Sequence, residues 1–254
     1  MQLTVSNCLA VFFRGLPSGF VKPIAGRGAW AFNAKEFVNL VRKASEKEQP
    51  VICVITTAQG KRRAVDYKRG VPFRMVENLH KRAGIERVTE LYTLSKKEAN
   101  LPAFYGKIDE ADAVFMSGGN QSFLADAFLG TEALAALNRL LQRGGVIGGS
   151  SAGAQVQSSF MTRGDYERRA ILGDKEHQIG FDFVKNSAFD VHVEERDREN
   201  DLFRVFRAKP SQLQIKDLNT HELLGIGIDQ GTAITVVRNQ FRVSGQGQVY
   251  IFDP

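Results

Sequence analysis

Apolar runs alternate with helical patterns along most of this chain. Four β-branched or apolar runs are typical of strands buried on both faces: residues 51–56, 88–94, 112–116 and 146–147. Three segments with apolar residues at near-helical spacing predict helices: residues 33–49, 71–83 and 123–141. Asn33 is a candidate N-cap of the first helix, and Gly130-Thr131 is a candidate break in the third. This alternation predicts a mostly parallel sheet with helices on both faces.

The last third of the chain has a different pattern. Four short apolar runs, split by turn residues, predict antiparallel strands: residues 224–229, 232–238, 241–244 and 249–253. We therefore expect an α/β fold with three layers, a mostly parallel sheet flanked by helices, and antiparallel strands at the C-terminus. The chain shows no repeat or linker, so residues 1–254 are expected to form a single α/β domain.

Composition narrows the class of protein. The chain is 43% hydrophobic and 24% charged, which is ordinary for a soluble globular protein. No apolar stretch approaches the roughly 18 residues of a membrane-spanning helix. The apolar run at residues 8–13 follows no basic segment and is closed by Arg14, so no signal peptide is expected. These features predict a cytoplasmic protein without a membrane partner.

The formal net charge of +6 raises the question of a nucleic-acid or acidic partner. The basic residues are scattered and interrupted by acidic ones, so we expect that the protein does not bind nucleic acid. Cys8 and Cys53 form neither a zinc pattern nor a disulfide framework, and Cys53 lies in a buried-strand run where a small core residue is expected. We therefore expect no metal.

The segment Gly149-Ser150-Ser151-Ala152-Gly153 follows the apolar run at residues 145–148. A Gly-x-Ser-x-Gly sequence between a strand and a helix holds a serine hydroxyl exposed on a sharp turn, because the glycines remove side chains that would collide there. The N–H group of Ala152 can face a developing oxyanion. We interpret Ser151 as a nucleophile.

A serine nucleophile needs a base, and the chain has four histidines. His80 lies among charged residues of a predicted helix, while His177 and His221 lie in predicted polar turns. His192 ends a strand-like run at residues 188–193, and the carboxyl ends of strands are where sites form in such sheets. His192 is therefore the preferred base, with a purely structural histidine as the alternative.

Three carboxylates are candidates for the group that orients the base. Asp165 and Glu167 follow the helix after the serine, and Asp190 lies two residues before His192 on the same face of its strand. Each could equally be a surface or turn carboxylate. The residues themselves leave this choice open.

A second glycine-rich strand exit, Gly118-Gly119-Asn120-Gln121, has two interpretations. It can be a turn with a helix cap, or it can supply an oxyanion N–H group and a substrate contact from Gln121. The phosphate-binding patterns of nucleotide sites are missing, so no nucleotide cofactor is expected. After His192, Arg196 and Arg198 lie close enough in the sequence to hold a substrate carboxylate.

Four segments in this order resemble the serine peptidase family of cyanophycinase and dipeptidase E: residues 114–121, 148–154, 190–192 and 223–234. The resemblance implies a fold similar to class I glutamine amidotransferases, with serine in place of cysteine. It implies a Ser–His–acid hydrolase that cleaves peptide or isopeptide bonds at aspartyl residues without a metal. The implied partner is a small peptide or a β-aspartyl peptide, and a homodimer is the candidate assembly.

The resemblance also implies residue roles. Ser151 matches the nucleophile and His192 the base. Asp165 resembles the acid of the dipeptidase, and we place it before Glu167, which is closer to the glutamate of cyanophycinase. The resemblance further implies that the N–H groups of Gly119 and Ala152 bind the oxyanion. It also implies that Gln121, Arg196 and Arg198 bind the substrate.

Two positions depart from cyanophycinase. Val191 stands where that enzyme has a glutamine, and Asp201 stands where it has a substrate-binding arginine. These departures make another β-aspartyl, Asp-X or acidic peptide as good a candidate substrate as cyanophycin. They also motivate the alternative hypothesis of a catalytically inactive relative that acts as a binding or scaffold protein.

Overall fold

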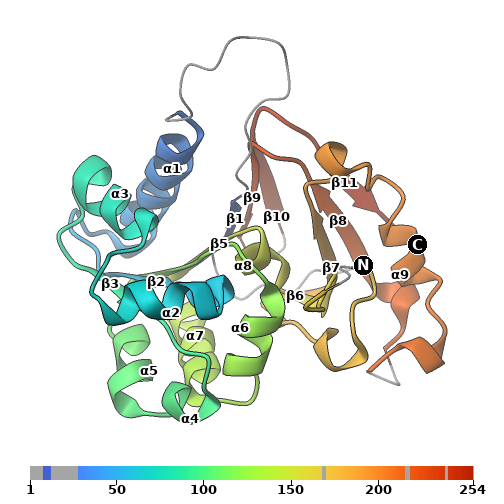
Figure 1. The fold of residues 1–254 in the computed structure, drawn as a ribbon. Coiled ribbons are helices and arrows are strands. Elements are labelled where there is room, and N and C mark those ends of the chain that lie inside the picture. The colour runs from blue at the N-terminus through green and yellow to red at the C-terminus, as the bar shows by residue number, and fades with distance from the viewer. Residues whose placement is uncertain (1–7, 13–27, 168–169, 215–217, 238–239, 254) are drawn as a thin grey trace.

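A computed structural model describes residues 8–12, 28–167, 170–214, 218–237 and 240–253. A seven-stranded sheet with the order β10-β9-β1-β5-β4-β2-β3 lies at its centre (Figure 1). Strands β1, β5, β4, β2 and β3 are parallel to one another, while β9 pairs antiparallel with β1 and β10 pairs antiparallel with β9. The strands of this sheet are β1 Cys8–Phe12, β2 Ile52–Ile55, β3 Val88–Leu91, β4 Ala113–Met116, β5 Val146–Ser150, β9 Thr232–Val237 and β10 Gln240–Gly245.

Helices cover both faces of this sheet (Figure 1). On one face, Phe37 and Leu79 from α1 and α3 pack with Val54 and Phe115 of the sheet. On the other face, residues of α5, α6, α7 and α8 form a second core cluster with the sheet. The helices are α1 Gly28–Ser45, α2 Lys61–Lys68, α3 Arg74–Ala83, α4 Lys96–Ala99, α5 Pro102–Asp109, α6 Gln121–Phe128, α7 Glu132–Gln142, α8 Ala152–Gln155 and α9 Leu202–Phe206. The expected three-layer α/β architecture is confirmed.

Some helix boundaries differ from the sequence prediction. Helix α1 begins at Gly28, so Asn33 lies inside it and is not an N-cap. The predicted break at Gly130-Thr131 is confirmed, because Thr131 caps α7 by accepting the N–H of Leu134. Helix α2 was not predicted. Its mean hydropathy is low and its residues are mostly charged, so it lacks the apolar periodicity that reveals a helix in a sequence.

A second sheet of four strands has the order β11-β8-β7-β6. Its strands are β6 Ser158–Met161, β7 Val184–Val191, β8 Leu224–Ile228 and β11 Val249–Phe252. Strands β6, β7 and β8 are parallel, while β11 pairs antiparallel with β8. The C-terminal strands are thus divided: β9 and β10 extend the central sheet, and β8 and β11 belong to the second one. Among the helices of the described residues, none combines the length and apolar character needed to cross a membrane.

The turn between β5 and α8 is a close approach of backbone to backbone. A Cβ atom on Gly149 would lie 2.1 Å from the carbonyl oxygen of Gly153. A Cβ atom on Gly153 would lie 2.3 Å from the carbonyl oxygen of Met116, at the end of β4. These distances are far below van der Waals contact, so both positions require glycine.

We expect Gly153→Ala to lower the free energy of unfolding by about 1–3 kcal/mol, because its methyl group must push against backbone atoms that cannot yield. Urea denaturation measures this change. Gly106→Ala is the matched control: Gly106 lies in α5 with no heavy atom within 4 Å of its added Cβ. This control should gain about 0.5–1 kcal/mol, since alanine is the better helix former. Equal effects of the two substitutions would contradict the close-packing account.

Candidate active site

Ser151 lies on the turn that the sequence predicted. Its backbone has φ 52° and ψ −112°, a conformation that non-glycine residues rarely adopt. Strand β5 ends immediately before it and helix α8 begins immediately after it. Such strained residues are found at functional sites, where the surrounding structure holds them in place. The half-buried serine hydroxyl is thus presented at the carboxyl end of the central sheet.

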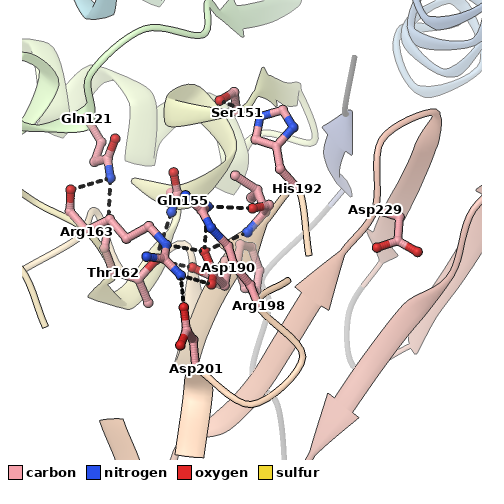
Figure 2. A network of polar contacts seen from close by, with 12 residues as sticks. Gln121, Ser151, Gln155, Thr162, Arg163, Asp190, His192, Arg198, Asp201 and Asp229 are labelled. Atoms are coloured by element: carbon pink, nitrogen blue, oxygen red, sulfur yellow. Dashed lines mark hydrogen bonds and ion pairs between the residues drawn. The ribbon is translucent and has the colours of Figure 1, made fainter. Parts of the chain in front are cut away.

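His192 meets this serine from the second sheet. The Oγ atom of Ser151 and the Nε2 atom of His192 are 3.2 Å apart (Figure 2). His192 directly follows β7, has φ 58°, and donates its backbone N–H to the carbonyl oxygen of Ile228 at 2.9 Å. Its side chain is 8% exposed. The structure therefore brings together the predicted nucleophile and base, which are 41 positions apart in the chain.

The three candidate carboxylates have different surroundings. Asp165 is buried and lines the same cavity as Ser151 and His192. Its carboxylate accepts the backbone N–H groups of Glu167 and Ala170, each at 3.0 Å. The Glu167 residue is exposed to solvent. Asp190 is fully buried, and its carboxylate is held by the guanidinium group of Arg163. Of these three carboxylates, Asp165 is the one that lines the cavity containing Ser151 and His192.

The loop Gly118-Gly119-Asn120 packs against the serine turn. A Cβ atom on Gly118 would lie 3.2 Å from the Cβ of Ser151. Gly119 has φ 142° and passes so close to Ala58 that an added Cβ would lie 1.9 Å from its carbonyl oxygen. The side chain of Gln59 donates to the carbonyl oxygen of Gly118. This loop is thus held from outside the site, in a place from which Gly119 could donate an N–H group.

Asn120 has two structural roles in this loop. Its side-chain oxygen accepts the N–H of Ser122 at 2.8 Å and caps α6, as the turn interpretation predicted. Its side-chain nitrogen donates to the carbonyl oxygen of Asp165 at 2.8 Å. Asn120 therefore links the glycine loop to the segment that carries the candidate acid.

The residues predicted to bind substrate also line this cavity, whose volume is about 120 Å³. Gln121 is buried and Arg196 is exposed. Arg198 is buried, donates to the carbonyl oxygen of Val191 at 2.8 Å and lies 3.5 Å from Asp190. Burial lowers the pKa of Arg198 to about 10, although the negative charge of Asp190 acts in the opposite direction. The structure thus brings the predicted substrate-binding residues into one cavity with Ser151 and His192.

A largely buried ion-pair network, whose residue Arg163 lines the cavity, is not predicted from the sequence (Figure 2). Arg163 binds Asp190 with two hydrogen bonds of 2.8 and 2.7 Å, and binds Asp201 at 2.6 Å. Burial lowers the pKa of Arg163, but hydrogen bonds and charges of Asp190 and Asp201 outweigh it and raise that pKa above its ordinary value. Asp201 therefore has a partner of opposite charge in this chain.

Gln155 was also missed. It is buried, it lines the cavity, and it lies four residues after Ser151 at the end of α8. Residues four apart share a helix face, so this spacing was a usable signal. Arg163 offered no such signal, because its contact with Asp190 joins positions 27 residues apart.

Comparisons with known proteins show which family and which structures the chain is similar to. A model of peptidase family S51 matches residues 32–244. Cyanophycinase of Synechococcus elongatus is 27% identical over 187 residues, covering 71% of this chain and 54% of that protein. Cyanophycinase of Geminocystis herdmanii is 28% identical over 152 residues, covering 58% of this chain and 51% of that protein. The chain thus spans about half the length of the curated relatives it matches.

Two solved structures share the fold. A peptidase from an acI-B1 Actinobacterium has a TM-score of 0.66 at 21% identity, with 98% of this chain and 91% of that one covered. A putative peptidase E protein from Listeria monocytogenes EGD-e has a TM-score of 0.57 at 15% identity, with 95% and 99% covered. At these identities the likeness concerns the fold, and it confirms the α/β architecture expected from the sequence.

We expect Asp190→Asn to lower the free energy of unfolding by about 3–5 kcal/mol, because it removes a negative charge between the buried guanidinium groups of Arg163 and Arg198. Chemical denaturation measures this loss. The matched control is Asp109→Asn, which breaks a partly exposed pair with Arg139 and should cost less than about 1 kcal/mol. Similar losses in both variants would show that the buried network has no special role.

Proposed function

This chain belongs to peptidase family S51, and from that premise we propose that it is a serine peptidase that cleaves peptide or isopeptide bonds at aspartyl residues. The observation that carries the proposal is the 3.2 Å contact between Ser151 and His192 on a strained strand-to-helix turn. Serine peptidases need this pairing, because a serine hydroxyl is a weak nucleophile until a base accepts its proton.

The proposed reaction has two stages. The Oγ atom of Ser151 attacks the carbonyl carbon of the substrate while the Nε2 atom of His192 takes the hydroxyl proton. His192 then returns this proton to the leaving amine, and the acyl group stays on Ser151. A water molecule next gives a proton to His192 and attacks the acyl-enzyme, which releases the acid product and restores the serine.

Asp165 is proposed to orient the imidazole of His192. Its burial in the same cavity and its two hydrogen bonds from main-chain N–H groups support this role, since a fixed carboxylate holds a base in one orientation. The N–H groups of Gly119 and Ala152 are proposed to bind the oxyanion. The position of the Gly118-Gly119 loop against Ser151 supports the first of these donors.

The aspartyl preference rests on the cationic side of the cavity and on the cyanophycinase relatives. Arg196, Arg198 and Gln121 line the cavity and are proposed to contact the substrate. The alternative, an inactive scaffold protein, accounts less well for a nucleophile and base that remain within reach of each other. Cytoplasmic location, homodimer formation and the lack of a nucleic-acid partner stay predictions from the sequence.

We expect Ser151→Ala to lower hydrolysis of aspartyl peptides by at least about 10³-fold, because the nucleophile is removed. It should also abolish labelling by a fluorophosphonate probe, which mass spectrometry can follow on the intact protein. Ser150→Ala is the matched control, since it removes the neighbouring hydroxyl from the same turn. Its activity and labelling should stay within a few-fold of the wild type. Full peptidase activity in Ser151→Ala would refute the assignment of the nucleophile.

Asp165→Asn and Glu167→Gln separate the two candidate acids. We expect Asp165→Asn to lower kcat by about 10³–10⁴-fold with a smaller change in KM, because the imidazole loses the carboxylate that orients it. Glu167→Gln should leave kcat within about twofold, since Glu167 faces solvent. Steady-state kinetics on one peptide measures both variants. The opposite ranking would assign the role to Glu167.

A further inference from the structure

Two adjacent glycines, Gly118 and Gly119, share the peptide group that carries one proposed oxyanion donor. Neither residue has a side chain, so the plane of this peptide can rotate by about half a turn with little steric resistance. The peptide is trans, and its carbonyl oxygen and its N–H group therefore point in opposite directions. The group that holds the carbonyl of Gly118 thus decides where the N–H of Gly119 points.

Gln59 holds this carbonyl. It is the last residue of a short 3₁₀ helix, η1 Thr57–Gln59, which follows β2. Its side-chain nitrogen donates to the carbonyl oxygen of Gly118, and the hydroxyl group of Ser117 donates to the same oxygen at 3.1 Å. Gly119 lines the cavity that contains Ser151, whereas Gln59 does not. The carbonyl is therefore bound on the side of Gln59, and the N–H of Gly119 is directed away from it.

Backbone contacts fix the distance between η1 and this loop. The N–H of Asn120 donates to the carbonyl oxygen of Ala58 at 2.8 Å, and an added Cβ on Gly119 would lie 1.9 Å from the same oxygen. These contacts hold the peptide group after Gly119, not the one before it. The orientation of the Gly118-Gly119 peptide depends on the side chains of Gln59 and Ser117. Ser117 is part of the same loop, so Gln59 is the contact that comes from another element.

The N–H of Gly119 is available to a ligand. Among the residues that the structure describes, no acceptor contacts it. Rotation of the peptide would turn the carbonyl oxygen of Gly118 toward the cavity, and the donors of Gln59 and Ser117 would lose their acceptor. A carbonyl oxygen in that place would repel the negative charge that develops in the transition state of acyl transfer.

We propose that Gln59 is a positioning residue for the oxyanion hole. By binding the carbonyl oxygen of Gly118, it keeps the N–H of Gly119 directed into the cavity, and it touches neither the substrate nor the reacting atoms. This role rests on the proposed peptidase function. The oxyanion charge is present in the transition state and not in the bound substrate, so loss of this contact should lower kcat and leave KM nearly unchanged.

Two substitutions of Gln59 separate its hydrogen bond from its shape. Gln59→Leu removes the donor, and we expect kcat for an aspartyl peptide to fall by about 10–100-fold with KM within about threefold. Gln59→Glu keeps the shape, but an ionised carboxylate only accepts hydrogen bonds. It repels the carbonyl of Gly118 and favours the rotated peptide, in which the N–H of Gly119 donates to it. At a pH of about 8, where glutamate is ionised, its loss of kcat should exceed that of Gln59→Leu.

Gln49→Leu is the matched control. Gln49 precedes β2, and its side chain also donates to a main-chain carbonyl, that of Gly84, at 3.1 Å. Its kcat and KM should stay within about twofold of the wild type, since this contact lies at the opposite end of the strand. The rate of reaction with a fluorophosphonate gives a second measurement that needs no peptide, and it should fall in the same order as kcat. The end point of labelling counts the reactive enzyme, so that kcat refers to folded protein in every variant.

Three results would overturn the role of Gln59. The first is an unchanged kcat and labelling rate in both Gln59 variants. The second is a loss in Gln59→Leu beside near-normal activity in Gln59→Glu, which would show that the shape of the side chain matters and its hydrogen bond does not. The third is a raised KM with an unchanged kcat, which would indicate a contact to bound substrate. All three leave the peptidase function standing, because the wild type still cleaves and reacts. A wild type that does neither refutes the proposed function and this inference together.

Discussion

The contact of backbone with backbone around Ser151 is the constraint on which the site depends. Gly149 and Gly153 leave no room for a Cβ atom, so strand β5 and helix α8 meet at a distance that side chains would prevent. This packing holds Ser151 at a φ of 52°, a conformation that costs free energy and that the surrounding structure must maintain. The hydroxyl group of Ser151 stands out from the sheet because the chain cannot relax there.

His192 reaches this hydroxyl from a different sheet, so the two sheets must be fixed relative to each other. Gln121 at the start of α6, which follows β4 of the central sheet, donates to the carbonyl oxygens of Thr162 and Arg163. Thr162 and Arg163 follow β6 and both contact residues of β7, so they connect the two sheets. The ion pairs of Arg163 with Asp190 and Asp201 are largely buried, and such pairs contribute less to net stability than their number suggests. Their directional hydrogen bonds instead define one arrangement of the strand end that carries His192.

The sequence alone predicted the features that depend on residues close together in the chain. Apolar periodicity predicted the layered sheet, the glycine pattern predicted the turn at Ser151, and a strand end predicted His192. The residues by themselves left the acid open, and Asp165 was placed first only on the family resemblance, because the burial of Asp165 and the exposure of Glu167 depend on an irregular loop without periodicity. Arg163 was missed because its partners are distant in sequence. Gln155 could have been found, since it is one helical turn after the serine.

Asn120 joins two parts of the site that the chain builds separately. One side chain caps α6 beside the glycine loop and also binds the main chain of Asp165. A displacement on either side is therefore transmitted to the other through one rigid amide. During evolution, the two loops could not drift independently: a substitution that shifts one changes which substitutions the other tolerates. Epistasis in this protein should accordingly centre on a residue that performs no chemistry itself.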